Sequence, residues 1–256
     1  MRIELATAPG DLQRPNEDYV SVALPASGRG GVLALLDGVT PPRGDDGCAH
    51  GVPWFTARLG GALLELSGSR RDMTLADCLA AAIEQTADKH RATCDLSHVL
   101  TPQATVVLAR WDDERVEYLV LSDSVLLLEG DDKEVTCVRD DRIDRLRAAG
   151  RLLAPLRNAE DGFFTAAADP LVAGRAVTGE LPRTRIRALA ALTDGAARWV
   201  EVFGEGDWTH CFGVLRKEGP QGLIDRVRAA ELADPAGRRF PRGKAHDDAA
   251  AVFVEP

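Results

Sequence analysis

The sequence predicts an α+β protein in which strands and helices form separate layers, and three observations indicate this fold class. Residues 104–139 contain closely spaced strands with short turns, typical of an antiparallel meander. Two amphipathic helices follow one another between residues 50 and 94 with no strand between them. Two buried strands, 31–38 and 186–195, contain apolar runs that lead into Asp-Gly. A doubly wound fold needs helices between parallel strands, and the hairpin turn at 112–114 argues against it.

Hydrophobic periodicity and turn residues place the elements of the first half. Strands are expected at 1–8, 18–24 and 31–38, with turn-forming residues between them. Helices are expected at 50–66 and, with Thr74 as N-cap, at 75–94. Because the two helices are joined by a short connection, they are expected to pack side by side on a sheet.

The second half begins with the meander, whose strands are expected at 104–111, 115–123, 125–130 and 133–139. A helix at 141–156 and an irregular segment at 157–184 precede the strand at 186–195. Short helices at 196–203 and 207–217, a helix at 220–234 that begins with Pro220, and a strand at 246–255 follow. No repeat or linker divides the chain, so residues 1–256 are expected to form a single domain.

Composition limits the classes of function. The chain has 256 residues, with 40 acidic and 31 basic side chains and a net charge of −9. This balance argues against nucleic acid and suits a protein that binds cations. No apolar run approaches the ~18 residues of a membrane span, and the first residues lack the apolar segment of a signal peptide. We therefore expect a cytoplasmic protein that does not bind a membrane.

Cysteine and histidine usage suggests no metal site of its own. The five cysteines are scattered, and no Cys-x-x-Cys pair exists. Reduced thiols are therefore expected, rather than a disulfide framework or a zinc knuckle. His90 and His98 are expected at the surface and His210 partly buried, none of them as a ligand.

Acidic residues, in contrast, stand where several predicted strands begin or end. They are Glu17, Asp18, Asp37, Asp123, Asp194, Asp247 and Asp248. One interpretation is that they are ordinary turn residues. The other is that they converge on Mg²⁺ or Mn²⁺, which prefer oxygen ligands and would relieve the repulsion between carboxylates. Asp248 suits a turn or a supporting contact better than ligation.

In this order the motifs NED (16–18), DG (37–38), SDS (122–124), TDG (193–195) and DDAAAVFV (247–254) resemble the type 2C family of metal-dependent protein Ser/Thr phosphatases. The resemblance covers almost the whole chain. It implies two antiparallel β-sheets packed as a central sandwich and flanked by helices, with metal ions at one end of the sandwich.

The resemblance assigns metal binding to Glu17, Asp18, Asp37, Gly38, Asp123, Asp194 and Asp247. Asp37 would bridge two ions, and Asp194 with Asp247 would complete one of the sites. Asp18 or Glu17 and the carbonyl of Gly38 would serve the other site. Asp123 is similar to the acid that helps hold a third ion.

The same resemblance implies a phosphatase that hydrolyses phosphoserine or phosphothreonine in proteins by attack of a metal-bridging water. Asp37 would act as a catalytic residue, as would Arg14, which resembles the arginine that grips the substrate phosphate.

Some positions depart from the family pattern. DGVTP (37–41) replaces the usual DGHGG or DGMGG, so either water or His50 would protonate the leaving group. Ser122 stands where the family usually has glycine. These departures leave an alternative open: a catalytically weak or inactive member that acts as a binding or regulatory module. Further alternatives are a phosphatase for a small metabolite or a dedicated protein partner, and a protein that binds divalent ions without chemistry.

Overall fold

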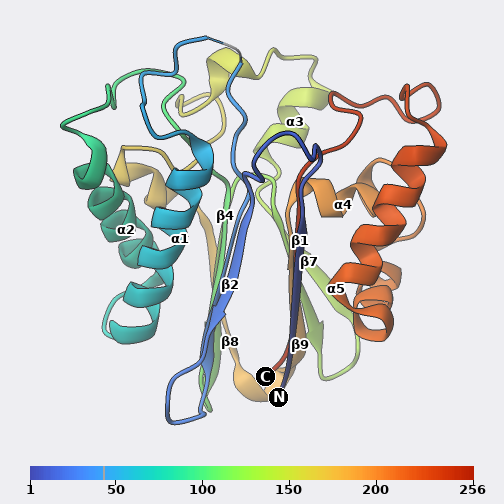
Figure 1. Cartoon of the computed structure of the whole chain (residues 1–256). Coiled ribbons are helices and arrows are strands. Elements are labelled where there is room, and N and C mark those ends of the chain that lie inside the picture. Colours follow the sequence, from blue (N-terminus) through green and yellow to red (C-terminus); the bar gives the residue numbers. More distant parts are fainter. Residues whose placement is uncertain (43) are drawn as a thin grey trace.

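The computed structural model describes residues 1–42 and 44–256, and two antiparallel five-stranded sheets form its centre (Figure 1). One sheet has the order β2 (Tyr19–Ala23), β3 (Gly31–Leu36), β4 (Val106–Trp111), β5 (Arg115–Leu121) and β8 (Val177–Pro182). The other has the order β1 (Arg2–Ala8), β10 (Ala249–Glu255), β9 (Ile186–Leu192), β6 (Val125–Gly130) and β7 (Val135–Val138). The predicted sandwich of two antiparallel sheets is confirmed.

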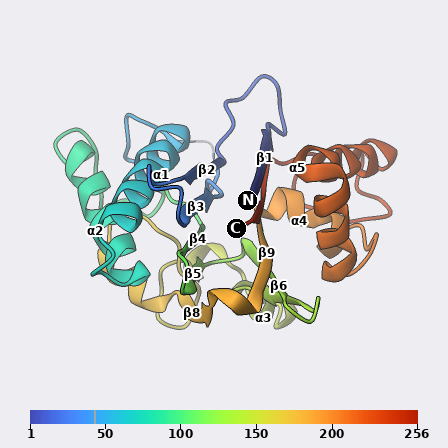
Figure 2. The ribbon, with the colours of Figure 1, turned by 90° about the horizontal axis from the view of Figure 1, so that it is seen from below.

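Helices cover the outer face of each sheet. On one side lie α1 (Val52–Ser69) and α2 (Leu75–His90), and on the other lie α4 (Asp194–Glu201) and α5 (Trp208–Ala233) (Figures 1 and 2). The short helix α3 (Arg142–Ala148) lies at one end of the sandwich. Short 3₁₀ helices are found at Ala154–Leu156, Pro170–Arg175 and Arg183–Arg185. The layers are therefore α-β-β-α, as expected.

Strand β3 shows why the central strands are apolar at every position. Its six residues are all buried. Leu33 and Leu35 belong to the core between the two sheets, whereas Val32, Ala34 and Leu36 pack in the core with α1 and α2. Both faces of the strand are covered, so no position is left for a polar side chain.

Helix boundaries follow local signals where those signals are strong. Thr74 caps α2 and forms a capping box with Asp77, as its position predicted. Within α5, Gly219 has φ of 75° and breaks the helical backbone, and Pro220 begins the segment that follows. The separate helices predicted at 207–217 and 220–234 are therefore the two parts of α5.

Two predictions for the segment 141–184 are wrong. The expected helix at 141–156 ends at Ala148, because the backbone turns at Gly150 with φ of 68°. Strand β8 lies in the segment that was expected to be irregular. It pairs with β5 along the edge of the sheet, and its residues alternate between partly buried and exposed. Gly179 and Pro182 are unfavourable in strands, so the sequence pattern does not predict a strand here.

Among the residues that the structure describes, no helix combines the length and the hydrophobicity needed to cross a bilayer.

Candidate active site

Asp37 and Asp194 meet where the two sheets end. Asp37 follows β3 in one sheet, and Asp194 follows β9 in the other. The backbone N–H of Asp194 donates to Oδ2 of Asp37 over 3.3 Å. Thr193 is the N-cap of α4 and Asp194 is its first residue, so Asp-Gly here begins a helix. The two similar motifs thus converge across the sandwich, not along one sheet.

The glycines that follow these aspartates allow other acidic segments to approach. A Cβ atom on Gly38 would lie 2.5 Å from the carbonyl oxygen of Glu17 and 2.5 Å from Val52. A Cβ atom on Gly195 would lie 1.8 Å from the carbonyl oxygen of Asp248. Only glycine fits such close backbone contacts. The two Asp-Gly motifs therefore bring the segments around Glu17 and Asp248 to the same end of the sandwich.

Asp18 and Asp248 hold these segments in place. Asp18 Oδ2 accepts a hydrogen bond from Thr193 Oγ1 at 2.8 Å. The carboxylate of Asp248 accepts the backbone N–H groups of Gly10 at 2.7 Å and Glu17 at 2.8 Å. Both oxygens of Asp248 are therefore engaged by backbone, which agrees with the supporting role expected for this residue.

Asp247 is the acid of this group with the most cationic surroundings. Its carboxylate pairs with Arg198 at 2.7 Å and with Lys244 Nζ at 2.7 Å. Lys244 also donates to Thr40 Oγ1 at 3.0 Å, and Thr40 in turn donates to Oε2 of Glu17. Lys244 and Thr40 therefore connect the carboxylate of Asp247 to that of Glu17.

Asp123 lies in the turn between β5 and β6. Ser122, which precedes it, has φ of 72°, a left-handed conformation that glycine adopts readily and serine does not. Ser122 Oγ donates to Oδ1 of Asp123 at 3.3 Å, and the guanidinium of Arg147 lies 3.7 Å from its Oδ2. The family pattern has glycine where Ser122 stands. The positive φ at this position explains that preference, because glycine adopts it without strain.

Burial and the crowding of carboxylates raise the pKa values of these acids. Burial, followed by the negative charge of nearby aspartates, raises the pKa of Asp37 well above its usual value. Burial also raises the pKa of Asp18 well above its usual value, although the Thr193 hydroxyl opposes this. Burial and the charge of Asp194 raise the pKa of Asp123 to about 6. Burial is also the main cause of the raised pKa of Asp247.

Four acids of this group line a cavity of about 340 Å³. Its lining includes Asp37, Gly38, Asp123, Asp194 and Asp247. A smaller cavity beside it, of about 160 Å³, is lined by residues that include Arg14, Glu17, Thr40, Lys244 and Asp247. Arg14 is exposed to solvent there. The candidate residues thus gather at one end of the sandwich, with the arginine next to the acids.

The donor set fits a hard divalent cation. All its side-chain donors are carboxylate oxygens, the ligands that Mg²⁺ and Mn²⁺ prefer. Within residues 1–42 and 44–256, no ion pair reaches the carboxylates of Asp18, Asp37 or Asp194, whereas Asp123 and Asp247 have basic partners. A group of buried carboxylates with no cation is unfavourable, and a bound metal ion removes that cost.

Comparison with known protein families gives no match to this sequence, and comparison with curated proteins gives none either. Solved structures do match. Serine/threonine phosphatase Stp1 from Staphylococcus aureus aligns with a TM-score of 0.62 and 12% identity, over 99% of this chain and 94% of that one. The S. agalactiae serine/threonine phosphatase aligns with a TM-score of 0.64 and 14% identity, over 100% and 99% of the two chains.

The catalytic domain of the serine/threonine protein phosphatase PstP, solved in complex with two manganese ions, is a third match. Its TM-score is 0.57 and its identity 19%, over 98% of this chain and 96% of that one. The fold of this chain is therefore that of the type 2C Ser/Thr phosphatases. The resemblance inferred from its five short motifs extends to the arrangement of the whole chain.

One side-chain cluster was missed by the sequence analysis. Cys48, His50, His90 and Cys94 lie together beside the start of α1 and the end of α2, and none of them lines the acidic cavity. His90 was expected at the surface but is only 2% exposed. His50 belongs to this cluster and does not line the acidic cavity, which argues against the alternative that it protonates a leaving group. The spacings Cys-x-His at 48–50 and His-x₃-Cys at 90–94 were the features of the sequence that could have indicated this cluster.

Proposed function

We propose that this protein is a phosphatase that depends on divalent metal ions and hydrolyses phosphoserine and phosphothreonine in proteins. The observation that carries the proposal is the meeting of Asp18, Asp37 and Asp194 at one end of the sandwich, where no basic side chain of residues 1–42 and 44–256 pairs with them. The three solved proteins compared above are named as Ser/Thr phosphatases, and the structure of one of them is a complex with two manganese ions.

In this proposal Asp37 would help to hold two Mg²⁺ or Mn²⁺ ions, as the resemblance to the type 2C phosphatases implies. Asp194 and Asp247 would hold one ion, and Asp18 or Glu17 with the carbonyl of Gly38 would hold the other. Asp123 is the candidate for a third, weaker ion. When bound, such ions make water nucleophilic at neutral pH and offset the charge of the phosphoryl group.

The residues around the acids define the rest of the proposed chemistry. Arg14 is exposed beside the acidic cavity, where its guanidinium can hold a phosphate through two parallel hydrogen bonds. Lys244 brings a second positive charge to the same place. Val39 lines the cavity with an apolar side chain, so the proton for the leaving group comes from water. In this proposal residues 1–256 act as one domain, because the acids come from both halves of the chain. We also propose that the enzyme is cytoplasmic.

Phosphate release from p-nitrophenyl phosphate and from a phosphothreonine peptide tests the proposal. Activity should require added Mn²⁺ or Mg²⁺ and should disappear with a chelator. Asp37→Asn and Asp194→Asn should each lower kcat by at least about 100-fold, because even partners outside the ligand shell contribute 10- to 100-fold. Asp225→Asn, an exposed change on α5, is the matched control and should keep wild-type rates.

Two further results decide the details. Arg14→Ala should raise KM for the phosphopeptide, and Arg14→Lys should restore only part of the loss because lysine lacks the planar fork. Turnover that persists in the chelator would exclude the metal-dependent mechanism. Thermal stabilisation by Mn²⁺ with no turnover on any phosphate ester would instead identify a binding or regulatory module.

A further inference from the structure

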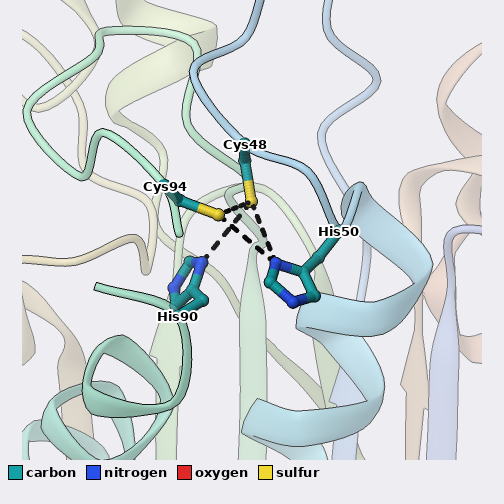
Figure 3. Close-up of side chains that lie close together, drawn as sticks. All are labelled: Cys48, His50, His90 and Cys94. Atoms are coloured by element: carbon teal, nitrogen blue, oxygen red, sulfur yellow. Dashed lines mark hydrogen bonds between the residues drawn. The ribbon is translucent and has the colours of Figure 1, made fainter. Parts of the chain in front are cut away.

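Four potential zinc ligands meet outside the acidic site. The ligating atoms of Cys48, His50, His90 and Cys94 all lie within 4.8 Å of one another, and among the described residues this is the only such group of three or more His, Cys, Asp or Glu side chains. Figure 3 shows the two sulfur atoms and the two imidazole rings directed at a common point. In both rings Nδ1 is the nitrogen that faces the thiols.

The distances approach those of a tetrahedral site. Zinc–sulfur and zinc–nitrogen bonds imply edges of roughly 3.8 Å between two sulfurs and 3.6 Å between sulfur and nitrogen. Cys48 Sγ lies 3.8 Å from His50 Nδ1 and 3.4 Å from His90 Nδ1, and Cys94 Sγ lies 3.3 Å from His50 Nδ1. The two sulfurs are 3.0 Å apart, so binding of an ion would increase the distance between them by about 0.8 Å.

The chain brings the ligands together in two short pieces. His90 is the last residue of α2 and Cys94 lies one turn later, so both side chains point to the same side. Cys48 and His50 stand just before α1, which begins at Val52. The backbone N–H of Asp95 donates to the carbonyl of Gly47 at 2.7 Å, a contact that joins the same two pieces.

Neighbouring groups support the imidazoles and the thiols. The ring of Trp54 lies 4.3 Å from that of His50 and 5.1 Å from that of His90, measured between centroids. This packing limits rotation of both imidazoles. The backbone N–H of Ala49 donates to Cys94 Sγ at 3.4 Å, and such a donor favours a thiolate over a thiol.

We propose that Cys48, His50, His90 and Cys94 bind one structural Zn²⁺ ion that fastens residues 44–51, immediately before α1, to the C-terminal end of α2. Two sulfur and two imidazole ligands in a tetrahedron are typical of zinc. All four positions are filled by the protein, so the ion has no open position for a substrate and acts on structure.

A disulfide between Cys48 and Cys94 is the competing explanation of the short contact between sulfurs. Their separation of 3.0 Å is well beyond a bond of about 2.05 Å, and both cysteines are free in the structure. A disulfide also gives no reason for two imidazole nitrogens to face the sulfurs. The coordination of an ion accounts for all four side chains at once.

Metal analysis of the chain, purified without chelator and freed of any histidine tag, tests the proposal. About one zinc per chain is expected. Cys48→Ser and Cys94→Ser should each lower the zinc content by about tenfold or more, since each removes a ligand. Cys137→Ser is the matched control, because it removes a thiol on β7 without touching the cluster, and it should leave the zinc content unchanged.

A second measurement does not depend on the folding of any variant. Metal-free wild-type protein should bind Co²⁺ with the intense visible bands of a tetrahedral site and the charge-transfer band of cobalt thiolates. Amide exchange in residues 44–51 should slow when zinc is restored. Wild-type protein with no zinc and no such cobalt spectrum, or a Cys48–Cys94 disulfide found by mass spectrometry in freshly purified protein, would overturn the proposal.

The zinc content separates this inference from the proposed phosphatase. Asp37→Asn should keep its zinc while losing turnover, because the acids do not belong to the cluster. A protein that holds zinc but hydrolyses no phosphate ester would leave the zinc site standing and remove the proposed function alone.

Discussion

The backbone N–H of Asp194 donates to the carboxylate of Asp37 across 3.3 Å, although the two residues are 157 positions apart and follow strands of different sheets. The contact places the Asp37 carboxylate at the N-terminal end of α4, where the helix offers partial positive charge. Burial and then the neighbouring carboxylates act in the opposite direction and raise the pKa of Asp37.

Removing one charge from this group should therefore benefit the metal-free protein. Asp37→Asn is expected to unfold at the same temperature as the wild type or up to about 2–4 °C higher, which corresponds to roughly 1 kcal/mol in a chain of this size. Thermal denaturation in metal-free buffer measures this. Saturating Mn²⁺ should reverse the order, because only the wild type retains the full set of ligands. A large loss of stability in metal-free Asp37→Asn would contradict the crowding of charges.

The pH dependence of stability should have the same origin. Acids whose pKa is higher in the folded than in the unfolded chain bind more protons when folded, so stability falls as pH rises between the two values. For Asp123 this window runs from about 4, the value for an unfolded chain, to about 6. Asp18 and Asp37 extend the fall to higher pH.

Metal-free protein should therefore have a lower melting temperature at roughly pH 8 than at roughly pH 5.5. Saturating Mn²⁺ should give the opposite slope, because protons compete with the ion for the carboxylates. Asp37→Asn should show a shallower dependence than the wild type in metal-free buffer. Identical slopes for the two proteins would rule out the acidic group as the cause.

Gly195 should be the least replaceable glycine near the site. Its missing Cβ would lie 1.8 Å from the carbonyl oxygen of Asp248, so Gly195→Ala must push β10 away from α4. We expect a loss of about 1–3 kcal/mol in the free energy of unfolding, together with weaker Mn²⁺ binding. Urea denaturation and calorimetric titration measure the two effects.

The matched control is Gly61→Ala in the exposed part of α1. Nothing lies within 4 Å of the Cβ that this change adds, and alanine favours a helix by up to about 1 kcal/mol. The two substitutions should therefore change stability in opposite directions. Equal effects would show that the contact with Asp248 does not constrain Gly195.

Ser122 offers a test of strain in the turn that carries Asp123. A left-handed conformation costs an L-residue about 1–2 kcal/mol, and glycine escapes this at an entropic cost of about 0.4–1 kcal/mol. Ser122→Gly should therefore be more stable than Ser122→Ala by about 0.5–1 kcal/mol. Both variants lack the hydroxyl that donates to Asp123. Urea denaturation of the two therefore measures the difference in stability that comes from the backbone conformation at residue 122. Alanine as the more stable variant would refute the strain.

The sequence predicted the layers and the acidic residues because both depend on local signals. A strand covered on both faces reads as an unbroken apolar run, and it stops where a polar residue can reach water. Asp37 and Asp194 were therefore visible as ends of such runs. Strand β8 was missed because it lies at a sheet edge, where alternate residues stay partly exposed.

The cluster around Cys48 was missed for a different reason. Its two halves are individually weak motifs, and they meet only because α1 and α2 pack side by side and place the start of one next to the end of the other. The ion pairs of Asp247 were also beyond the sequence, since Arg198 and Lys244 reach it from α4 and from the loop before β10. Such contacts depend on tertiary structure, which residue spacing does not encode directly.

Strands β1 and β10 pair along their full length, with Arg2 opposite Glu255. Both ends of the chain consequently lie close together (Figure 1), at the opposite end of β10 from Asp247 and Asp248. A fusion partner attached at either end would sit roughly 20 Å or more from the cavity, the length of a seven-residue strand. Reporter domains, affinity handles or a covalent link between the ends can be added there without obstructing access for a bulky substrate.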